Sequence, residues 1–237
     1  MSAGAAQAAP LAEAMEAIKS NDCARLGDAV NRHIDSSAAV QYLAGVMHEE
    51  GICVERDLDR AGRYYAAADQ RRDGSAARDI GLEYLKGSEL PRSYARAGAW
   101  LAKSLSMRRE SSSQVRLPRS IVALPATHVP PEAEWAGYLV SVGFVSSHTL
   151  QYPKEALRNG TEGSFIARVC VADGTVNTTT VKVEPGPVAG TASVAGRRQL
   201  LHAIEENYDT VMKSMPPPPA PAPGGLCFQQ SVVFRIR

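Results

Sequence analysis

The first half of the chain repeats itself at a spacing of 36 residues, the distance from Gly45 to Gly81. The segment GVMHEEGICVERDLDRAGRYYAA, which starts at Gly45, aligns without a gap with GLEYLKGSELPRSYARAGAWLAK, which starts at Gly81. The aligned identities are Gly45/Gly81, Gly51/Gly87, Arg56/Arg92, Arg60/Arg96, Ala61/Ala97, Gly62/Gly98 and Ala66/Ala102. A period in the thirties is typical of stacked helix pairs, so this feature predicts an α-helical solenoid.

Each repeat is predicted to hold two helices joined by a loop. Residues 37–50 and 75–86 form the first helix of each pair, and Gly51 and Gly87 follow them where a helix C-cap favours a left-handed residue. The positions at which neighbouring helices must pack closely are small, namely Gly45, Gly81, Ala61 and Ala97. The aromatic residues beside them are Tyr64, Tyr65 and Trp100. Such a stripe at helical spacing predicts packing between helices.

The small–Leu/Gly–aromatic–Gly and Ala–aromatic–Ala pattern of residues 37–107 resembles the Sel-one-like repeat family, relatives of tetratricopeptide repeats. The loop GSELPRSY departs from that family because it lacks the usual acidic turn. Two repeats alone would leave apolar faces uncovered, so we expect a degenerate helix pair, broken at Ser20-Asn21-Asp22, to cap the solenoid. The predicted repeat domain covers residues 11–107, with cap helices at 11–34 and repeats at 37–74 and 75–107.

Residues 1–10 are expected to be disordered, or to be the segment that follows a signal cleavage site. They lack the basic start and the continuous apolar stretch of an intact signal peptide, but they are rich in small residues, as such segments are. We therefore expect a mature, periplasmic sequence that carries an added methionine in place of its signal peptide.

The four cysteines fall in two pairs, Cys23 with Cys53 and Cys170 with Cys227. An even count with one pair in each half favours two disulfides within the two modules, formed in an oxidising compartment. A Cys23–Cys53 bond would fasten the cap helices to the loop of the first repeat. The alternative is four buried thiols in a reducing cytosol. The spacing contains neither a Cys-x-x-Cys motif nor a cysteine–histidine cluster typical of zinc.

The middle of the chain is ambiguous. Residues 108–136 include a polar, proline-punctuated stretch and are interpreted as a linker. Pro131 followed by Glu132 and Glu134 begins like a helix, whereas the alternation of the next segment favours a strand over residues 137–146. The alternating residues are Tyr138, Val140, Val142 and Phe144.

The last third of the chain predicts a small αβ module. A short helix in KEALRNG, ended by Gly160, precedes a hairpin signal in which alternating apolar residues flank Asp173-Gly174. An amphipathic helix, RRQLLHAIEENYDTVMKSM, and a proline tract then lead to a last alternating strand, LCFQQSVVFRIR. The sequence thus predicts an α+β chain of two domains, in which residues 137–237 form an antiparallel sheet with a packed helix.

The order of these elements, opened by Tyr-Pro-x-x-Ala and closed by Val-x-Phe-x-Ile, resembles the TonB C-terminal domain family. The resemblance covers about residues 150–237 and rests on Tyr152, Pro153, Ala156, Gly160, Gly163, Asp173, Gly174, Val176, the prolines before Gly224-Gly225, Val232, Phe234 and Ile236. It implies a periplasmic domain that binds envelope proteins by adding a strand to a sheet edge, here residues 228–236. The chain departs from the energy-transducing members of that family because a repeat domain stands where they have a membrane anchor and a proline-rich spacer.

Neither nucleic-acid binding nor catalysis is predicted. A net charge of +1 with scattered basic pairs does not provide the local excess of positive charge that phosphates require. The longest nearly apolar run, residues 136–145, is too short to span a bilayer. The five histidines, including His48 and His202, stand in no metal-binding or catalytic motif, so we assign no catalytic, cofactor or metal residue.

These features predict a protein-binding component of the bacterial cell envelope. The candidate partner-binding residues are Tyr65, Trp100, Phe228, Val232, Phe234 and Ile236. The expected partner is an outer-membrane receptor, an envelope assembly component or an effector enzyme. Two other hypotheses stay open, a TonB-type role in energy transduction and an inhibitor or immunity protein that binds a toxic effector enzyme.

Overall fold

The computed structural model describes residues 3–71, 73–107, 129–171, 179–186, 193–219 and 226–236. Within these residues the chain is an α+β protein that divides into two compact units. The first unit contains helices α1–α6, and the second contains helices α7–α9 with a three-stranded antiparallel sheet. Among the described residues, no helix combines the length and the apolar content that crossing a bilayer needs.

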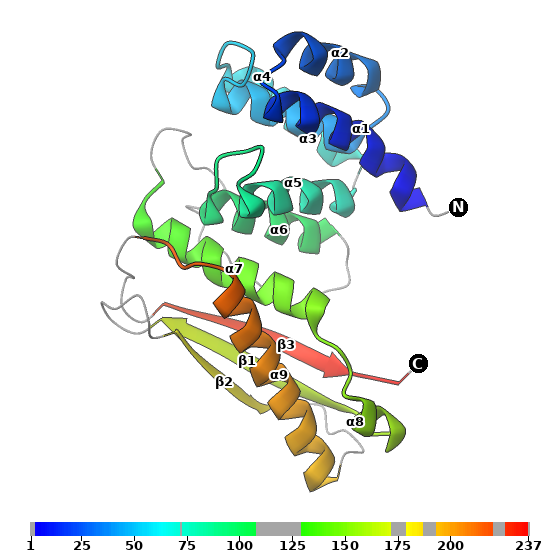
Figure 1. The fold of residues 1–237 in the computed structure, drawn as a ribbon, viewed down its shortest axis with the longest axis vertical. Coiled ribbons are helices and arrows are strands. Elements are labelled where there is room, and N and C mark those ends of the chain that lie inside the picture. The colour runs from blue at the N-terminus through cyan, green and yellow to red at the C-terminus, as the bar shows by residue number, and fades with distance from the viewer. Residues whose placement is uncertain are drawn as a thin grey trace. The chain divides into compact units, whose positions relative to one another are not determined.

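The first unit is built from three consecutive helix pairs (Figure 1). The helices are α1 (Ala3–Lys19), α2 (Cys23–His33), α3 (Ala38–Glu50), α4 (Leu58–Gln70), α5 (Gly74–Lys86) and α6 (Tyr94–Met107). Helices α3 and α5 also pack on each other, as do α1 and α3. One apolar core, which includes Leu26, Leu43 and Ile80, therefore runs through successive pairs.

The second and third pairs share the same hydrogen bonds at the spacing found in the sequence. The amide of Asp57 donates to the His48 carbonyl at 2.9 Å, and the amide of Ser93, 36 positions later, donates to the Tyr84 carbonyl at 3.3 Å. The N-cap side chains also recur at this spacing, as Ser37 with Asp73 and Asp57 with Ser93. The repeat predicted over residues 37–107 is therefore a repeat of local structure.

Glycine ends the first helix of both pairs. Gly51 and Gly87 are the C-cap residues of α3 and α5, with φ of 76° and 69°. This left-handed conformation is costly for a residue with a Cβ, so glycine stops each helix and turns the chain into the loop. The predicted C-caps are confirmed.

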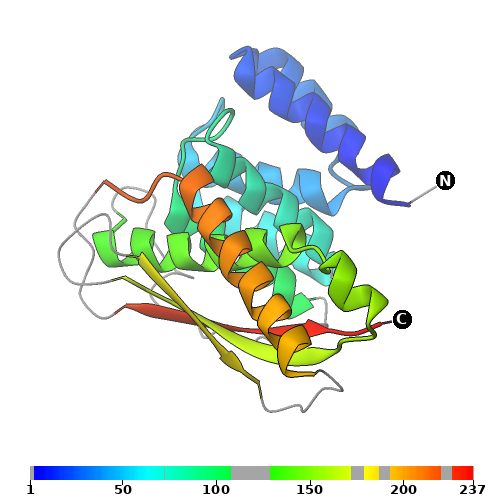
Figure 2. The same ribbon diagram turned by 60° about the horizontal axis from the view of Figure 1, so that its bottom comes forward.

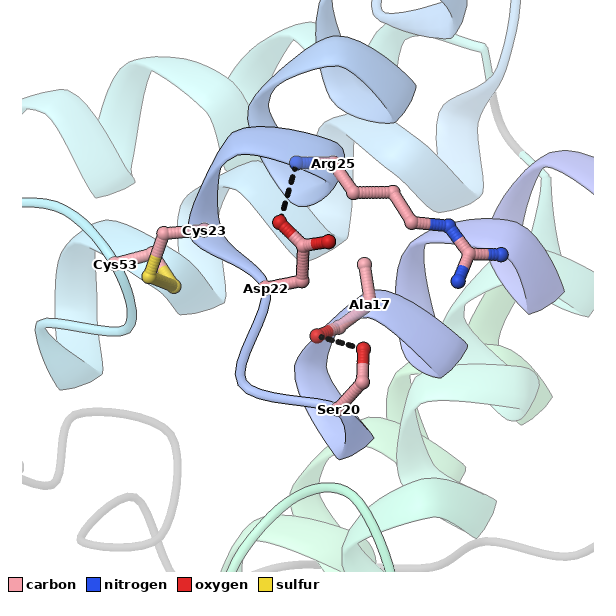
Figure 3. The surroundings of a disulfide bond; sticks show 6 residues. All are labelled: Ala17, Ser20, Asp22, Cys23, Arg25 and Cys53. Carbon is pink, nitrogen blue, oxygen red and sulfur yellow. Dashed lines mark hydrogen bonds between the residues drawn. A yellow bond between two sulfur atoms is a disulfide. The ribbon is translucent and has the colours of Figure 1, made fainter.

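The first pair, α1 and α2, packs on α3 but differs from the other pairs in its connection. Only Ser20, Asn21 and Asp22 separate the two helices, and Asp22 caps α2 by accepting from the Arg25 amide at 3.0 Å (Figure 3). Helix α1 begins at Ala3, so the described residues of the segment 1–10 are helical, contrary to the prediction of disorder. The alanine content of this segment accounts for the longer helix, because alanine has the highest helix propensity.

The four cysteines form two disulfides, and none of them is free. Cys23, the first residue of α2, bonds to Cys53 in the loop after α3 (Figure 3). Cys170 bonds to Cys227 in the second unit. The predicted pairing within each half is therefore confirmed, and the alternative of four free thiols is wrong for this structure.

Replacing Gly45 with valine is expected to lower the free energy of unfolding of the first unit by about 2–3 kcal/mol. A Cβ on Gly45 would lie 2.2 Å from Cε1 of Tyr65, and one on the equivalent Gly81 would lie 3.0 Å from Leu101, the equivalent of Tyr65. Gly62→Ala on α4 is the control, because nothing lies within 4 Å of its new methyl group. This control should be stabilised by up to about 1 kcal/mol in the same denaturant titration. A neutral Gly45→Val variant would contradict the close packing.

The second unit is a sheet covered on one face by two helices (Figures 1 and 2). Its elements are α7 (Pro131–Thr149), α8 (Lys154–Arg158), β1 (Gly163–Val171), β2 (Thr179–Pro185), α9 (Val194–Ser214) and β3 (Cys227–Phe234). The strand order is β2-β1-β3, with both neighbours antiparallel to β1. The predicted hairpin, amphipathic helix and last strand are confirmed, whereas Asp173-Gly174 lies outside the described residues.

The alternation of β1 buries one face of the sheet under the helices. At most 2% of each inward side chain of β1 is exposed, namely Phe165, Ala167, Val169 and Val171. Helix α9 also has a stripe of buried residues. The buried residues of α9 are Gly196, Leu200, Ile204, Tyr208 and Val211. Helix α9 packs on β2 and β1, and α7 packs on β3 and α9, so each helix covers a different part of that face.

The strand predicted over residues 137–146 is wrong, because these residues lie inside α7. The residues between the alternating apolar positions are also buried, including Gly137, Leu139 and Ser141. Helix α7 is apolar on all sides, so its sequence has no helical period to oppose the strand pattern. Pro131 and the acidic first turn were the correct signals. Residues 131–136, predicted as linker, are the first turns of this helix.

Candidate partner-binding surfaces

The outer edge of β3 presents alternate backbone groups that do not bond to β1. The Val171 amide donates to the Leu226 carbonyl at 2.9 Å, so these two residues form a hydrogen-bonded pair of the antiparallel ladder. Because the pattern alternates along an antiparallel ladder, the backbone amide and carbonyl groups of every second residue of β3 bond to β1. These residues are Phe228, Gln230, Val232 and Phe234. The residues whose amide and carbonyl point away from β1 are Cys227, Gln229, Ser231 and Val233.

The outer edge of β2 is protected, in contrast to that of β3. The Gly186 amide donates to the Ser164 carbonyl at 2.7 Å, which places Glu184 and Lys182 in hydrogen-bonded pairs with β1 and turns the backbone of Val181, Val183 and Pro185 outward. Pro185 has no amide proton to offer at that edge. Lys182 and Glu184 add charged, largely exposed side chains that pair with each other at 3.0 Å. Proline and charge are the usual protection of edge strands.

The side chains of β3 on the helix-covered face belong to the core of the second unit. The Phe228 ring lies over Gly143 of α7, where an added Cβ would approach it to 2.2 Å. Gln230 accepts from the buried Tyr208 hydroxyl at 2.7 Å, and burial raises the pKa of Tyr208. The Phe234 ring packs against Tyr152, with centroids 5.1 Å apart. The strand is therefore held in position by its inner side chains.

The four candidate residues on and beyond this strand consequently lie in different environments. Phe228 and Phe234 are buried, Val232 is half-buried, and Ile236, which follows the strand, is exposed. Of these four candidates for partner binding, Phe228 and Phe234 are thus held in the core. What β3 offers at its edge is backbone, together with the outward side chains of Gln229, Ser231 and Val233.

The two candidates in the first unit, Tyr65 and Trp100, lie in the packing between the repeats. Their ring centroids are 5.3 Å apart in an edge-to-face arrangement, and Trp100 also meets the buried Tyr42 at 4.8 Å. The ammonium of Lys103 lies 5.3 Å from the Trp100 ring and pairs with Asp69 at 2.7 Å. Both candidates are half-buried, so only part of each ring is accessible.

A polar cluster joins all four helices of the two repeats. Arg96 on α6 pairs with Glu50 and lies 3.6 Å from Glu49, both on α3, and its own side chain is 10% exposed. The hydroxyl of Tyr84 on α5 donates to Glu50 at 3.1 Å, and that of Tyr65 on α4 donates to Glu49. Burial, followed by the charge of Glu49, raises the pKa of both tyrosines. The phenols therefore stay protonated and serve as donors.

Within the described residues, no group of three or more histidine, cysteine or acidic side chains is arranged to hold a metal ion. His48 is buried and stacks on Tyr64, with centroids 5.6 Å apart, while exposed His202 pairs with Glu206 one turn along α9. Both histidines thus have structural partners. Neither lies in an arrangement that indicates acid–base chemistry.

No family model, curated protein or solved structure matches the chain.

The β3 edge is predictable from the sequence alone, but the contrast between the two edges is not. The signal was present in the sequence, because VKVEP carries a lysine, a glutamate and a proline, whereas CFQQSVVF carries no charge and no proline. It could be interpreted only once the strand order showed that both segments form edges.

Proposed function

We propose that the protein binds other proteins of the bacterial cell envelope through the outer edge of β3. The observation that carries this proposal is the difference between the edges: proline and charge protect β2, whereas β3 has neither. An extended partner segment would pair with the outward backbone groups of residues 227–233, and its side chains would contact Gln229, Ser231 and Val233. Backbone pairing supplies affinity, and the side chains select the partner.

The first unit serves in this proposal as a second protein-binding surface. Its support is the duplication of helix pairs at a spacing of 36 residues, the arrangement from which helical solenoids are built. The resemblances to Sel-one-like repeats and to the TonB C-terminal domain also support this proposal, because each of them implies a module that binds proteins. The two disulfides support an oxidising location such as the periplasm.

Proline at residue 233 is expected to abolish partner binding while leaving the fold intact. The Val233 amide points away from β1, so Val233→Pro removes a group available to a partner without removing a hydrogen bond to β1. Val183→Pro is the matched control, because it makes the same change at the outer edge of β2. A photo-reactive residue at position 229 reports on the edge in native envelope extract. Its cross-linked product should disappear with Val233→Pro and persist with Val183→Pro.

Cross-linking that survives Val233→Pro would place the interface elsewhere, provided that both variants keep the unfolding temperature of the parent protein. Identification of the captured protein distinguishes the three kinds of partner. A receptor favours a transport role, an assembly component favours an adaptor, and a toxic enzyme favours an inhibitor.

A further inference from the structure

One end of the second unit brings together three segments that are distant in the sequence. The segments are α8 (154–158), the first turn of α9 (194–198) and the residues after β3 (235–236), here called the α8 tip. Gln199 donates to Glu155 at 2.9 Å, which joins α9 to α8, and the Ile236 amide donates to Glu162 at 2.6 Å, which holds the end of the chain beside α8. Figures 1 and 2 show α8, the start of α9 and the C-terminus at this same end.

The α8 tip exposes aliphatic side chains. Val194 is 81% exposed, Leu157 47% and Ile236 42%, and each comes from a different one of the three segments. They are three of the five large hydrophobic side chains that are exposed among the described residues. Each of the three segments thus contributes one exposed aliphatic side chain to the tip.

The same three segments also carry exposed cationic side chains. The exposed cations of the tip are Lys154, Arg158, Arg197, Arg198 and Arg235. The ion pairs described for this unit, Lys182–Glu184, His202–Glu206 and Lys213–Asp209, include none of them. Glu155, which follows Lys154 in α8, accepts a hydrogen bond from Gln199, and Glu162 accepts one from the Ile236 amide. The described part of the tip therefore has an excess of positive charge.

We propose that the α8 tip docks on an anionic lipid surface. Cations attract the negative headgroups, while single aliphatic side chains enter the boundary between headgroups and acyl chains. A nucleic acid would use the same charge, but single-stranded nucleic acids also bind stacking aromatic side chains, and the exposed hydrophobic residues of the tip are all aliphatic. The proposal concerns a surface distinct from the outward groups of β3 and does not depend on strand pairing.

The test is co-sedimentation of the full chain with vesicles. Vesicles of an equal mixture of phosphatidylcholine and phosphatidylglycerol should bind the protein, those of pure phosphatidylcholine should not, and added salt should release it. The double variant Arg197→Gln, Arg198→Gln should bind about 25-fold more weakly, since each basic residue near an anionic surface contributes roughly 5-fold. Leu157→Ser with Val194→Ser should weaken binding by a factor that does not change with salt over the range in which the parent protein binds, because the lost contribution is not electrostatic.

Matched controls come from α4. Arg60→Gln with Arg63→Gln removes the same charge from the first unit, and Leu58→Ser removes an aliphatic side chain that is 55% exposed. Both should bind as the parent protein does. The proposal is overturned if phosphatidylglycerol vesicles do not bind, if the α4 variants lose as much binding as the tip variants, or if the tip variants lose binding only to single-stranded DNA.

Discussion

Replacing both Cys170 and Cys227 with serine is expected to lower the free energy of unfolding by about 4 kcal/mol. The bond closes a loop between residues separated by 57 positions, and the chain-entropy model assigns larger effects to longer loops. The two cysteines face each other in the register of β1 and β3, so the bond fixes the start of the edge strand. Denaturant unfolding monitored by circular dichroism measures the change.

The other disulfide provides an internal comparison. Cys23 and Cys53 are 30 positions apart, so Cys23→Ser with Cys53→Ser should cost about 3.5 kcal/mol, slightly less than the pair in the sheet. The intact mass of the parent protein should fall below the fully reduced value by two hydrogens for each of the two bonds. A complete set of reactive thiols in the purified native protein would contradict both disulfides and remove the support for a periplasmic location.

Replacing Arg96 with methionine is expected to destabilise the first unit by about 3–5 kcal/mol. Methionine keeps most of the apolar volume of the side chain but leaves Glu49 and Glu50 without their shared cation. Their side chains are only 21% and 18% exposed, so solvent replaces little of the lost interaction. Chemical denaturation at neutral pH measures the effect.

The repeat supplies the control for this substitution. Arg60 occupies the position in α4 that Arg96 occupies in α6, but its side chain is 60% exposed and pairs with Asp57 at 3.7 Å. Arg60→Met should change the free energy of unfolding by less than about 1 kcal/mol, because exposed ion pairs contribute little. Equal effects at the two positions would show that the polar cluster does not hold the repeats together.

The parts of the fold that the sequence predicted correctly are those in which local signals agree. Gly51 and Gly87 end helices, and the 36-residue spacing repeats the whole local pattern, so propensity and periodicity favour the same structure. The alternation of β1 and the stripe of α9 are similarly clear, because each element has one buried face and one exposed face.

Prediction failed where burial removes that contrast. In α7, residues such as Leu139 and Ser141 are buried as fully as the alternating residues beside them, so no period distinguishes helix from strand. Which side chains of the candidate surfaces are exposed depends on contacts between residues that are distant in the sequence. Phe228 and Phe234 looked suitable for binding, but their burial follows from Gly143 and Tyr152, which are far away in the sequence.

The bond between Cys170 and Cys227 also limits the ways in which another chain could join this sheet. Strand exchange, in which a partner strand replaces β3, would require β3 to separate from β1. While the disulfide is intact, Cys227, the first residue of β3, stays bonded to Cys170 of β1. The aromatic contact of Phe234 with Tyr152 anchors the other end. A partner segment can therefore join the sheet only by pairing with the outer edge of β3, while β3 stays paired with β1. This step requires no unfolding of the second unit, and its reversal requires no refolding.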